Sequence, residues 1–504
     1  MPTDPPAVRR LPDQPDLDHL KGQAKTLQRQ LRAADPDAIA LIQQFDRSAE
    51  AADDLALTSA QRVIARSYGF ASWGRLREHV KIINEYTRSP EPAALDESDD
   101  PATLADRLLR LATLNYTQDD SQARNVARDL VTRHPELATV DVHTMAATGA
   151  ADELAEELRR SPELANADGG PFNWPPLLYL CYGRLGDLPG RSAVRTAAAL
   201  LQAGADPNAG FLWRGLMSPF TALTGVFGGG EQDQPAHQHS AALARLLLEA
   251  GADPNDNQTL YNRCFRPAND HLRLLFGYGL GTDVDSPWRH RFGDHYPTVE
   301  QMITEQLRWA ADAGMIERVQ LLLDHRVPVD GRGYHPIFGD RTPYQLAVLA
   351  GNREIATLLA DHGADTSTVG PADLLLGACL AGDAEGAQDV LRQHPSALQR
   401  VHDRWPDAVW RAADKGRIDG VRLLLEFGLD PNTPGRFGTT ALHQAAHDGR
   451  TDLVALLLEQ GADPTLVEDR FHSRPSGWAD HSGQHDLAIR LRAAEEDWHG
   501  QPGA

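Results

Sequence analysis

The 504-residue sequence has few cysteines and no long apolar run. Its 3 cysteines are too few for a disulfide framework, and Cys181 and Cys379 lie in apolar stretches that suit small core residues. The opening MPTDPPAVRRLPDQPDLDHL lacks the apolar segment of a signal peptide. No stretch approaches the roughly 18 uninterrupted apolar residues of a membrane span. We therefore expect a reducing, cytoplasmic setting and no membrane partner.

Basic side chains are also in deficit. The 49 Lys and Arg residues face 71 Asp and Glu residues, which gives a formal charge of -22. General binders of nucleic acid or of anionic membranes need a basic surface, so this balance argues against both classes. A solvated acidic surface that keeps the chain soluble explains the charge. The length exceeds what one compact core can organise, so several domains or one elongated array are expected.

Recognisable catalytic motifs are missing too. The glycine-rich stretch 225–233 lacks the Gly-Lys-Ser/Thr ending of a phosphate-binding loop, and the sequence contains neither G-x-S-x-G nor H-E-x-x-H. His237, His239, His290 and His295 lie in two loops without acidic or cysteine ligands at a recognisable spacing. The sequence therefore predicts no catalytic residue, no metal site and no cofactor, although a triad assembled from distant residues stays open.

One short string repeats along the chain. AGADPN stands at 203–208 and again at 250–255, and GADP returns at 461–464, each after a leucine-rich run. Such self-similarity is typical of a solenoid. Gly428 and Gly461, which end two predicted helices, lie 33 residues apart, whereas Gly204 and Gly251 lie 47 apart. The excess indicates insertions at 225–239 and 283–297, and insertions in repeat arrays are often functional.

The clearest unit spans 440–463. Thr440 is expected to cap a short helix, Ala445 and Ala446 are small enough for neighbouring repeats to approach closely, and a second helix directs its leucines into the shared core. Gly449 permits the reversal between the helices. Gly461 is expected to end the second helix in a left-handed conformation, with the following Asp-Pro in a projecting turn.

Helical periodicity also marks the first 88 residues. Leu17, Leu20, Ala24, Leu27 and Leu31 form one apolar stripe. TSAQ at 58–61 has the form of a capping box, and Ser72 is expected to cap a further helix. The stretch 89–101, SPEPAALDESDDP, is acidic and contains proline, so it reads as a linker.

The unit at 440–446 resembles the ankyrin repeat, whose T-P-L-H-x-A pattern it matches with alanine in place of proline, and Thr342-Pro343 keeps the proline. The resemblance covers 140–494 and implies an all-α solenoid of about nine repeats. Residues 11–88, with AQRVIARSYGFASW, are similar to a helical module that precedes ankyrin arrays in bacterial, especially actinobacterial, proteins. The expected organisation is a small helical domain at 11–88, an acidic linker at 89–101, a helical lead-in at 102–139 and repeats at 140–495.

The resemblance implies protein recognition through the hairpin tips and the inner helix face. The turns that join one repeat to the next carry aromatic residues beside arginines, which are types enriched at binding hot spots. If these tips align, they form a ladder that favours an acidic protein partner. The residues predicted to contact it are Trp213, Arg214, Trp288, Arg289, Arg291, Phe292, Tyr334, Arg404, Trp405, Arg436, Phe437, Arg470 and Phe471.

Three alternatives stay open. Each aromatic residue can instead pack on the next turn, while its arginine pairs with an aspartate such as Asp330, Asp403 or Asp469. The two insertions can form a pocket for a substrate or small ligand. The N-terminal module can be the functional part, with the array merely presenting it.

Overall fold

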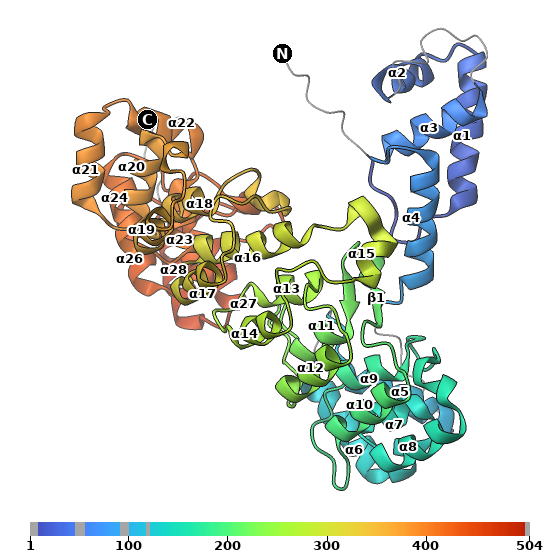
Figure 1. The fold of residues 1–504 in the computed structure, drawn as a ribbon. Coiled ribbons are helices and arrows are strands. Elements are labelled where there is room, and N and C mark those ends of the chain that lie inside the picture. Colours follow the sequence, from blue (N-terminus) through green and yellow to red (C-terminus); the bar gives the residue numbers. More distant parts are fainter. Residues whose placement is uncertain (1–8, 46–55, 91–99, 117–120, 499–504) are drawn as a thin grey trace. The chain divides into compact units, whose positions relative to one another are not determined.

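The computed structural model describes residues 9–45, 56–90, 100–116 and 121–498, and contains 28 α-helices in those ranges. The only sheet in them is a two-stranded antiparallel hairpin, β1 (Gly210–Leu212) with β2 (Pro219–Thr221). The expectation of a largely helical fold is therefore confirmed. Contacts divide the chain into two compact units, residues 1–302 and residues 303–504 (Figure 1).

The first unit begins with a helical module. Its helices are α1 (Leu17–Arg32), α2 (Pro36–Phe45), α3 (Leu57–Ser67) and α4 (Trp73–Tyr86). Their apolar faces share one core, in which the predicted stripe of α1 is buried at Leu20, Ala24 and Leu27. The predicted cap at Ser72 is confirmed, because its hydroxyl accepts a hydrogen bond from the Arg75 N–H at 3.3 Å.

The predicted capping box at 58–61 is wrong. Helix α3 already begins at Leu57, and its N-cap residue Ala56 offers no side-chain acceptor. The expected acidic linker falls mostly at 91–99, outside the described residues.

Paired helices follow in the first unit. The pairs are α5 (Pro101–Ala112) with α6 (Ser121–Arg133), α7 (Val142–Thr148) with α8 (Ala151–Arg160), α9 (Pro176–Tyr182) with α10 (Ala193–Gln202), α11 (Ala222–Phe227) with α12 (Ser240–Glu249), and α13 (Asn257–Arg263) with α14 (Asp270–Gly277). The first helices of successive pairs, α5 to α13, contact one another in order, and α8, α10 and α12 form a second row. Each pair thus buries its apolar faces against its neighbours, as in a solenoid.

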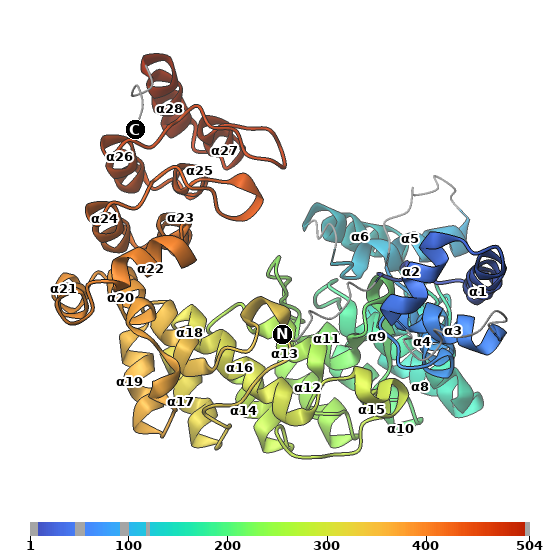
Figure 2. The same cartoon turned by 90° about the horizontal axis from the view of Figure 1, so that it is seen from above.

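The pattern continues in the second unit. Helix α16 (Val299–Ala313) leads into α17 (Ile316–Asp324), α18 (Pro343–Leu349), α19 (Arg353–Asp361), α20 (Pro371–Leu380), α21 (Ala384–Gln393), α22 (Ala397–Arg404), α23 (Ala408–Asp414), α24 (Ile418–Glu426), α25 (Ala441–His447), α26 (Thr451–Glu459), α27 (Pro475–His481) and α28 (His485–Asp497). Figure 2 shows α23, α25 and α27 stacked in one row, with α24, α26 and α28 in a second.

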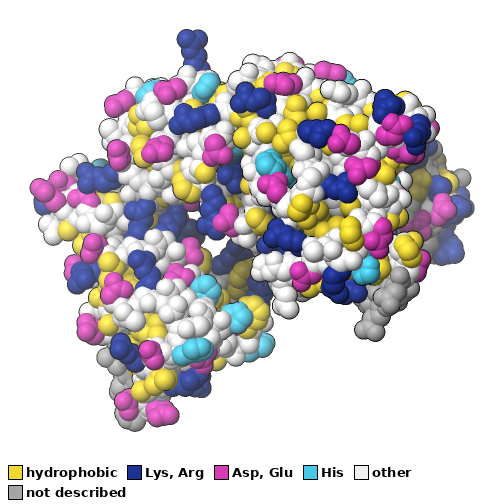
Figure 3. All heavy atoms as spheres, turned by 90° about the horizontal axis from the view of Figure 1, so that it is seen from below, with side chains coloured by type: hydrophobic (Ala, Val, Ile, Leu, Met, Phe, Trp, Pro, Cys, Tyr) yellow, Lys and Arg dark blue, Asp and Glu magenta, His cyan; other side chains and the backbone are white. Residues whose placement is uncertain are grey.

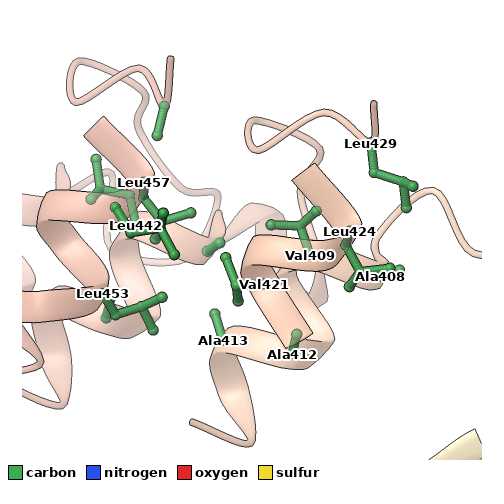
Figure 4. Close-up of a cluster of buried hydrophobic side chains, with 14 of the residues drawn as sticks. Ala408, Val409, Ala412, Ala413, Val421, Leu424, Leu429, Leu442, Leu453 and Leu457 are labelled. Atoms are coloured by element: carbon green, nitrogen blue, oxygen red, sulfur yellow. The ribbon is translucent and has the colours of Figure 1, made fainter. Parts of the chain in front are cut away.

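Small residues let neighbouring helices of the first row approach each other closely. Ala412 and Ala413 of α23 and Ala445 and Ala446 of α25 are buried, and α23 contacts α25 directly. Side chains of α23 to α26 point toward one another in the shared core, where Leu453 is fully buried (Figure 4). The predicted left-handed conformation at Gly461 is confirmed by its φ of 83°.

The turn motif also joins one helix pair to the next, a role that the sequence analysis missed. In each asparagine bridge, as we term this contact, the side-chain amide donates to the carbonyl of a glycine in the following turn, and its oxygen accepts from the N–H of the aspartate two residues on. The bridges run from Asn166 to Gly204 and Asp206, from Asn208 to Gly251 and Asp253, and from Asn432 to Gly461 and Asp463, at 2.7–3.1 Å. Asn208 is 9% exposed, so its polar groups need these partners.

The insertion at 283–297 forms the short helix α15 (Pro287–Phe292), which packs against the N-terminal module. The Trp288 ring meets the Tyr86 ring of α4 at 5.1 Å between centroids, and Arg291 stacks on both. The indole N–H of Trp288 donates to the Asn208 carbonyl at 2.9 Å. This insertion therefore links the module to the helix pairs of the first unit.

Further contacts tie the module to two turns of the helix pairs. The Trp174 indole N–H donates to the Arg88 carbonyl at 2.9 Å, and the Arg88 side chain pairs with Asp168 at 2.6 Å. The Arg214 N–H donates to the Ser89 hydroxyl at 2.7 Å. The module thus covers turns that were predicted to be open to a partner.

Candidate functional site

We call the turn between one helix pair and the next a finger. Three of the aromatic side chains predicted on fingers are buried: Trp288 and Phe292 are each 3% exposed, and Trp405 is 4% exposed. Trp288 and Phe292 stack on each other within the contact between α15 and α4. These rings have no free surface to offer a partner, so the aromatic ladder is not continuous.

Other predicted contact residues are half-buried or paired. Arg404 stacks on Trp405 and forms an ion pair with Asp373 at 3.2 Å, and Arg289 pairs with Asp283. Arg214 stacks on the half-buried Trp213. At these positions the packing alternative describes the arrangement better than a binding ladder does.

Tyr334 belongs to a finger organised by a buried carboxylate. The Tyr334 N–H donates to Glu305, which is 2% exposed and pairs with the buried Arg308 at 3.0 Å. Such a buried pair needs additional hydrogen bonds to offset its desolvation, and the N–H groups of Tyr334 and His335 in the finger backbone supply two. The Tyr334 ring itself is half-buried.

The last two fingers differ from the rest. Phe437 is 48% exposed and Phe471 is 63% exposed, among the most exposed large apolar side chains in the described residues. Arg436 stacks on Phe437 with its guanidinium carbon 4.7 Å from the ring centroid. Arg470 lies over both rings, 5.5 Å from Phe437 and 5.0 Å from Phe471. We call these four side chains the finger-tip cluster.

Neither guanidinium of this cluster has an ion pair among the described residues. Asp469 directly precedes Arg470 in the sequence. Its N–H donates to the Phe437 carbonyl at 3.0 Å, so it links the two fingers through the backbone. The predicted pairing of Arg470 with an aspartate such as Asp469 is not observed. Arg436 and Arg470 therefore keep their hydrogen-bond donors available.

The final finger is folded around the carboxylate of Glu468, which is 1% exposed. It accepts hydrogen bonds from the N–H groups of Arg470, Phe471 and Ser473 at 2.7–3.1 Å. Burial by itself raises the pKa of Glu468, but these N–H groups outweigh it and the pKa is lowered. The aromatic ring at 471 is thus presented by an ordered loop.

His443 also holds the same finger in place, through hydrogen bonds of its two ring nitrogens. Its Nδ1 lies 2.9 Å from the Thr440 hydroxyl, and its Nε2 lies 3.1 Å from the Ser473 carbonyl of the next repeat. Burial lowers the pKa of His443, so the neutral ring donates through Nε2. His443 therefore has a structural role, joining a turn of its own repeat to the next finger.

Phe437 also has an unusual backbone. Its φ of 58° lies in the left-handed region, which costs a non-glycine residue about 1–3 kcal/mol. A large exposed ring in a strained conformation contributes little to folding. Arg214, in another finger, has a similar φ of 48°, so this backbone conformation recurs among the fingers.

The two insertions line separate hollows. Asp283, Asp285, Arg289 and His290 surround an open hollow of about 420 Å³, but Arg289 pairs with Asp283 and His290 with Asp285. His237 of the other insertion borders a space of only about 20 Å³. Neither hollow contains residues from both insertions, so the predicted shared pocket has no support here.

Charge is distributed evenly over the surface in view. Acidic and basic side chains are interspersed on the face shown in Figure 3. Within the described part of the chain, no helix has the length and apolarity that crossing a bilayer requires. A local cluster such as the finger tips therefore carries more information about partners than the net charge does.

Part of the second unit matches a known family. Residues 375–468 match the family model for ankyrin repeats, in three copies. These residues are ankyrin repeats. No curated protein matches the chain. In the finger-tip cluster, Arg436 and Phe437 lie within the matched repeats, and Arg470 and Phe471 lie in the turn directly after them.

This match covers only part of the expected array. Repeats were predicted at 140–495 after a small helical domain; the match spans 375–468, and the region before it is large rather than small. The bounds 140–495 stay a prediction. The similarity of 11–88 to a bacterial module stays an expectation. Ankyrin repeats indicate protein–protein interaction without specifying the partner.

Proposed function

We propose that this chain is a non-catalytic protein-binding scaffold whose main contact surface is the finger-tip cluster. The observation that carries the proposal is the pair of exposed rings at Phe437 and Phe471, each stacked with an arginine. Aromatic and arginine side chains dominate the binding energy of many interfaces. Protein binding is also what the ankyrin repeats indicate.

The charge of the cluster favours an acidic partner. Arg404 and Arg289 pair with aspartates of their own chain, whereas Arg436 and Arg470 have no ion pair among the described residues. A planar guanidinium binds a carboxylate through two parallel hydrogen bonds. An interface rich in Asp or Glu beside apolar side chains would satisfy both parts of the cluster.

The fingers are ordered before any partner arrives. Glu468 holds the last finger through three N–H groups, and the Asp469 N–H joins it to the finger of Phe437. An interface that is already ordered loses less conformational entropy on binding. This order supports recognition by the rings themselves rather than by a loop that folds on contact.

The variant R436A/F437A/R470A/F471A tests the proposal. Proteins captured on the full-length chain are identified by mass spectrometry, and the purified partner is titrated against each variant. We expect a loss of affinity of about 100-fold or more, because truncation of several hot-spot residues removes most of the binding energy. Circular dichroism should stay unchanged.

A matched control is available on α28. Ile489 is 62% exposed and Arg490 is also exposed, so I489A/R490A removes an apolar side chain and an arginine elsewhere on the same unit. Equal binding by both variants contradicts the proposal. Loss of helicity only in the finger-tip variant favours the packing alternative.

The small-ligand alternative has weaker support. Its best hollow, at 283–293, is open and its charged side chains pair with one another. A site built for a ligand usually holds polar groups that lack partners within the protein.

A further inference from the structure

A second surface lies on the inner helices of the second unit. A hollow of about 240 Å³ opens between α18, α20 and α23, and we call it the inner-face hollow. The side chains that line it are Asp312, Ile337, Phe338, Arg341, Leu346, Leu349, Leu376, Leu380, Trp405, Trp410, Arg411, Asp414 and Lys415, with no residue of the finger-tip cluster among them. Its volume is below the roughly 300–1,000 Å³ of pockets that hold drug-sized ligands.

The floor and walls are mainly apolar. Leu346, Leu376 and Trp405 are buried beneath the hollow, and Ile337 at its edge is 56% exposed. Trp410 is held in place because its indole N–H donates to the Thr439 hydroxyl at 3.0 Å. These walls suit one or two apolar side chains of a peptide.

Most charges around the hollow are already paired. Arg411 pairs with Asp407 at 2.9 Å, and Lys415 pairs with Asp312 at 3.0 Å. Arg341 is different, because its half-buried guanidinium makes no hydrogen bond or ion pair within the described ranges. An unpaired cation beside apolar walls is costly to keep, and an incoming anion would satisfy it.

The surroundings of Arg341 strengthen this point. Burial lowers its pKa, and so do the positive charges of Arg404 and Arg411, whereas the carboxylates of Asp373 and Asp312 raise it. The guanidinium nevertheless stays charged at neutral pH, since the ordinary pKa of arginine lies so high. Burial also raises the pKa of Asp414, another residue that lines the hollow, and so disfavours its charged form. Because Asp373 already pairs with Arg404 and Asp312 with Lys415, the Arg341 guanidinium is the group left to receive an anion.

We propose that the inner-face hollow binds a peptide segment in which a carboxylate stands next to a large apolar side chain, with Arg341 pairing with the carboxylate. The apolar side chain would lie against Trp405 and Trp410. This inference rests on the proposed protein-binding function and names the chemistry of the segment that the inner face recognises.

A phage-displayed library of random dodecapeptides, panned on the full-length chain, supplies the probe. We expect enriched peptides to carry Asp or Glu next to Leu, Ile, Phe or Trp. Synthetic copies should bind R341M about tenfold or more weakly, because a charge-assisted pair is lost. R400A is the matched control, since Arg400 is exposed on α22 and does not line the hollow.

Further measurements separate binding from folding. R341M should keep or raise the melting temperature, because it removes an unpaired charge next to two arginines and retains the apolar stem. R341E should reverse the preference toward peptides with Lys or Arg. A lower melting temperature for R341M, enrichment without acidic residues, equal binding to R341M, or no enrichment each overturns the inference.

The same peptides distinguish this inference from the proposed function. They should bind the finger-tip variant R436A/F437A/R470A/F471A with unchanged affinity, because that cluster does not line the hollow. Loss of partner binding in the finger-tip variant alone leaves the hollow unsupported. Loss of peptide binding in R341M alone leaves the finger-tip proposal untouched.

Discussion

Glu468 shows how a single side chain shapes the finger that presents Phe471. Its carboxylate accepts three backbone N–H groups while almost fully buried, which is the arrangement that keeps a carboxylate ionised in a low-dielectric setting. Glu305 bonds to the Tyr334 N–H in a similar way. A buried acid therefore helps to organise the backbone of both fingers.

The first residue-scale prediction concerns E468Q. The amide loses the charge that strengthens each hydrogen bond, and bonds to charged groups are worth about 1.5–3 kcal/mol. We expect the amide protons of Arg470, Phe471 and Ser473 to exchange at least tenfold faster, measured by hydrogen exchange at neutral pH. E459Q, at an exposed position on α26, is the control. Equal exchange in the two variants contradicts the role given to Glu468.

The stability of this finger should depend on pH, because the pKa of Glu468 is lowered in the folded chain. The pKa of Glu468 is lowered in the folded chain from its ordinary value of 4.5, so the stabilisation is fully present above pH 4.5. It is lost as the pH falls through the folded pKa. The protection of the same three amides, relative to their intrinsic exchange rates at each pH, should therefore decrease at acid pH in the wild type and less so in E468Q.

At this scale the sequence predicted which residue types occupy the fingers, but not their exposure. Arg404 stacks on the adjacent Trp405 and Arg436 on the adjacent Phe437, whereas Arg291 stacks on Trp288, three residues away. Whether a ring is buried depends on what packs against it. Trp288 is covered by Tyr86, which lies some 200 residues earlier, and no local pattern reveals such a contact.

At the scale of elements, the asparagine bridges explain why the turn string recurs. Each joins a turn to the next one through both halves of a single amide, as Asn432 does with Gly461 and Asp463. In a solenoid, stability is the sum of the repeats and of the interfaces between neighbours. The bridges belong to the interface part of that sum.

The prediction at this scale concerns N432A. The variant leaves the Gly461 carbonyl and the Asp463 N–H without their partner, which costs about 1–3 kcal/mol for each group that stays buried. We expect a lower urea midpoint for the transition that includes the last repeats. The urea midpoint of N432D should fall between those of the wild type and N432A, because a carboxylate can accept from the Asp463 N–H but cannot donate to the Gly461 carbonyl. Asp330 offers this half-bridge naturally, accepting from the Asp365 N–H at 3.1 Å. An unchanged midpoint in N432A would mean that the bridges do not couple repeats.

The helix pairs were predictable because leucine periodicity and helix-ending glycines are local signals. The bridges were not predicted, since the turn after each helix-ending glycine was expected only to project away from the helices. The spacing of Asn208 and Asn255 from their preceding glycines was the available signal. The insertion at 283–297 was located correctly, but its helix α15 and its packing depend on α4 and so required the structure.

At the scale of the molecule, the first unit holds its N-terminal module tightly. Tyr86 packs on Trp288, Arg88 receives the Trp174 indole N–H, and Ser89 receives the Arg214 N–H. The fingers of this unit are thus partly occupied by the chain itself. The exposed rings of the finger-tip cluster lie in the second unit, where the match to ankyrin repeats also falls.

Removal of residues 1–99 tests this interpretation. The truncation uncovers Trp288 and Phe292, so we expect greater binding of the dye ANS and concentration-dependent association in light scattering. R75A is the control, because it removes only the exposed pair between Arg75 and Asp294. A truncated chain that stays monomeric and binds no more dye would show that the module is dispensable to the first unit.

The central claim is that the four residues of the finger-tip cluster carry the binding of a protein partner. The most direct measurement is the dissociation constant of the captured partner for the wild type, for R436A/F437A/R470A/F471A and for I489A/R490A. The account predicts a loss of about 100-fold or more in the first variant and less than about threefold in the second, with both fully helical. Equal affinity of all three proteins would contradict it.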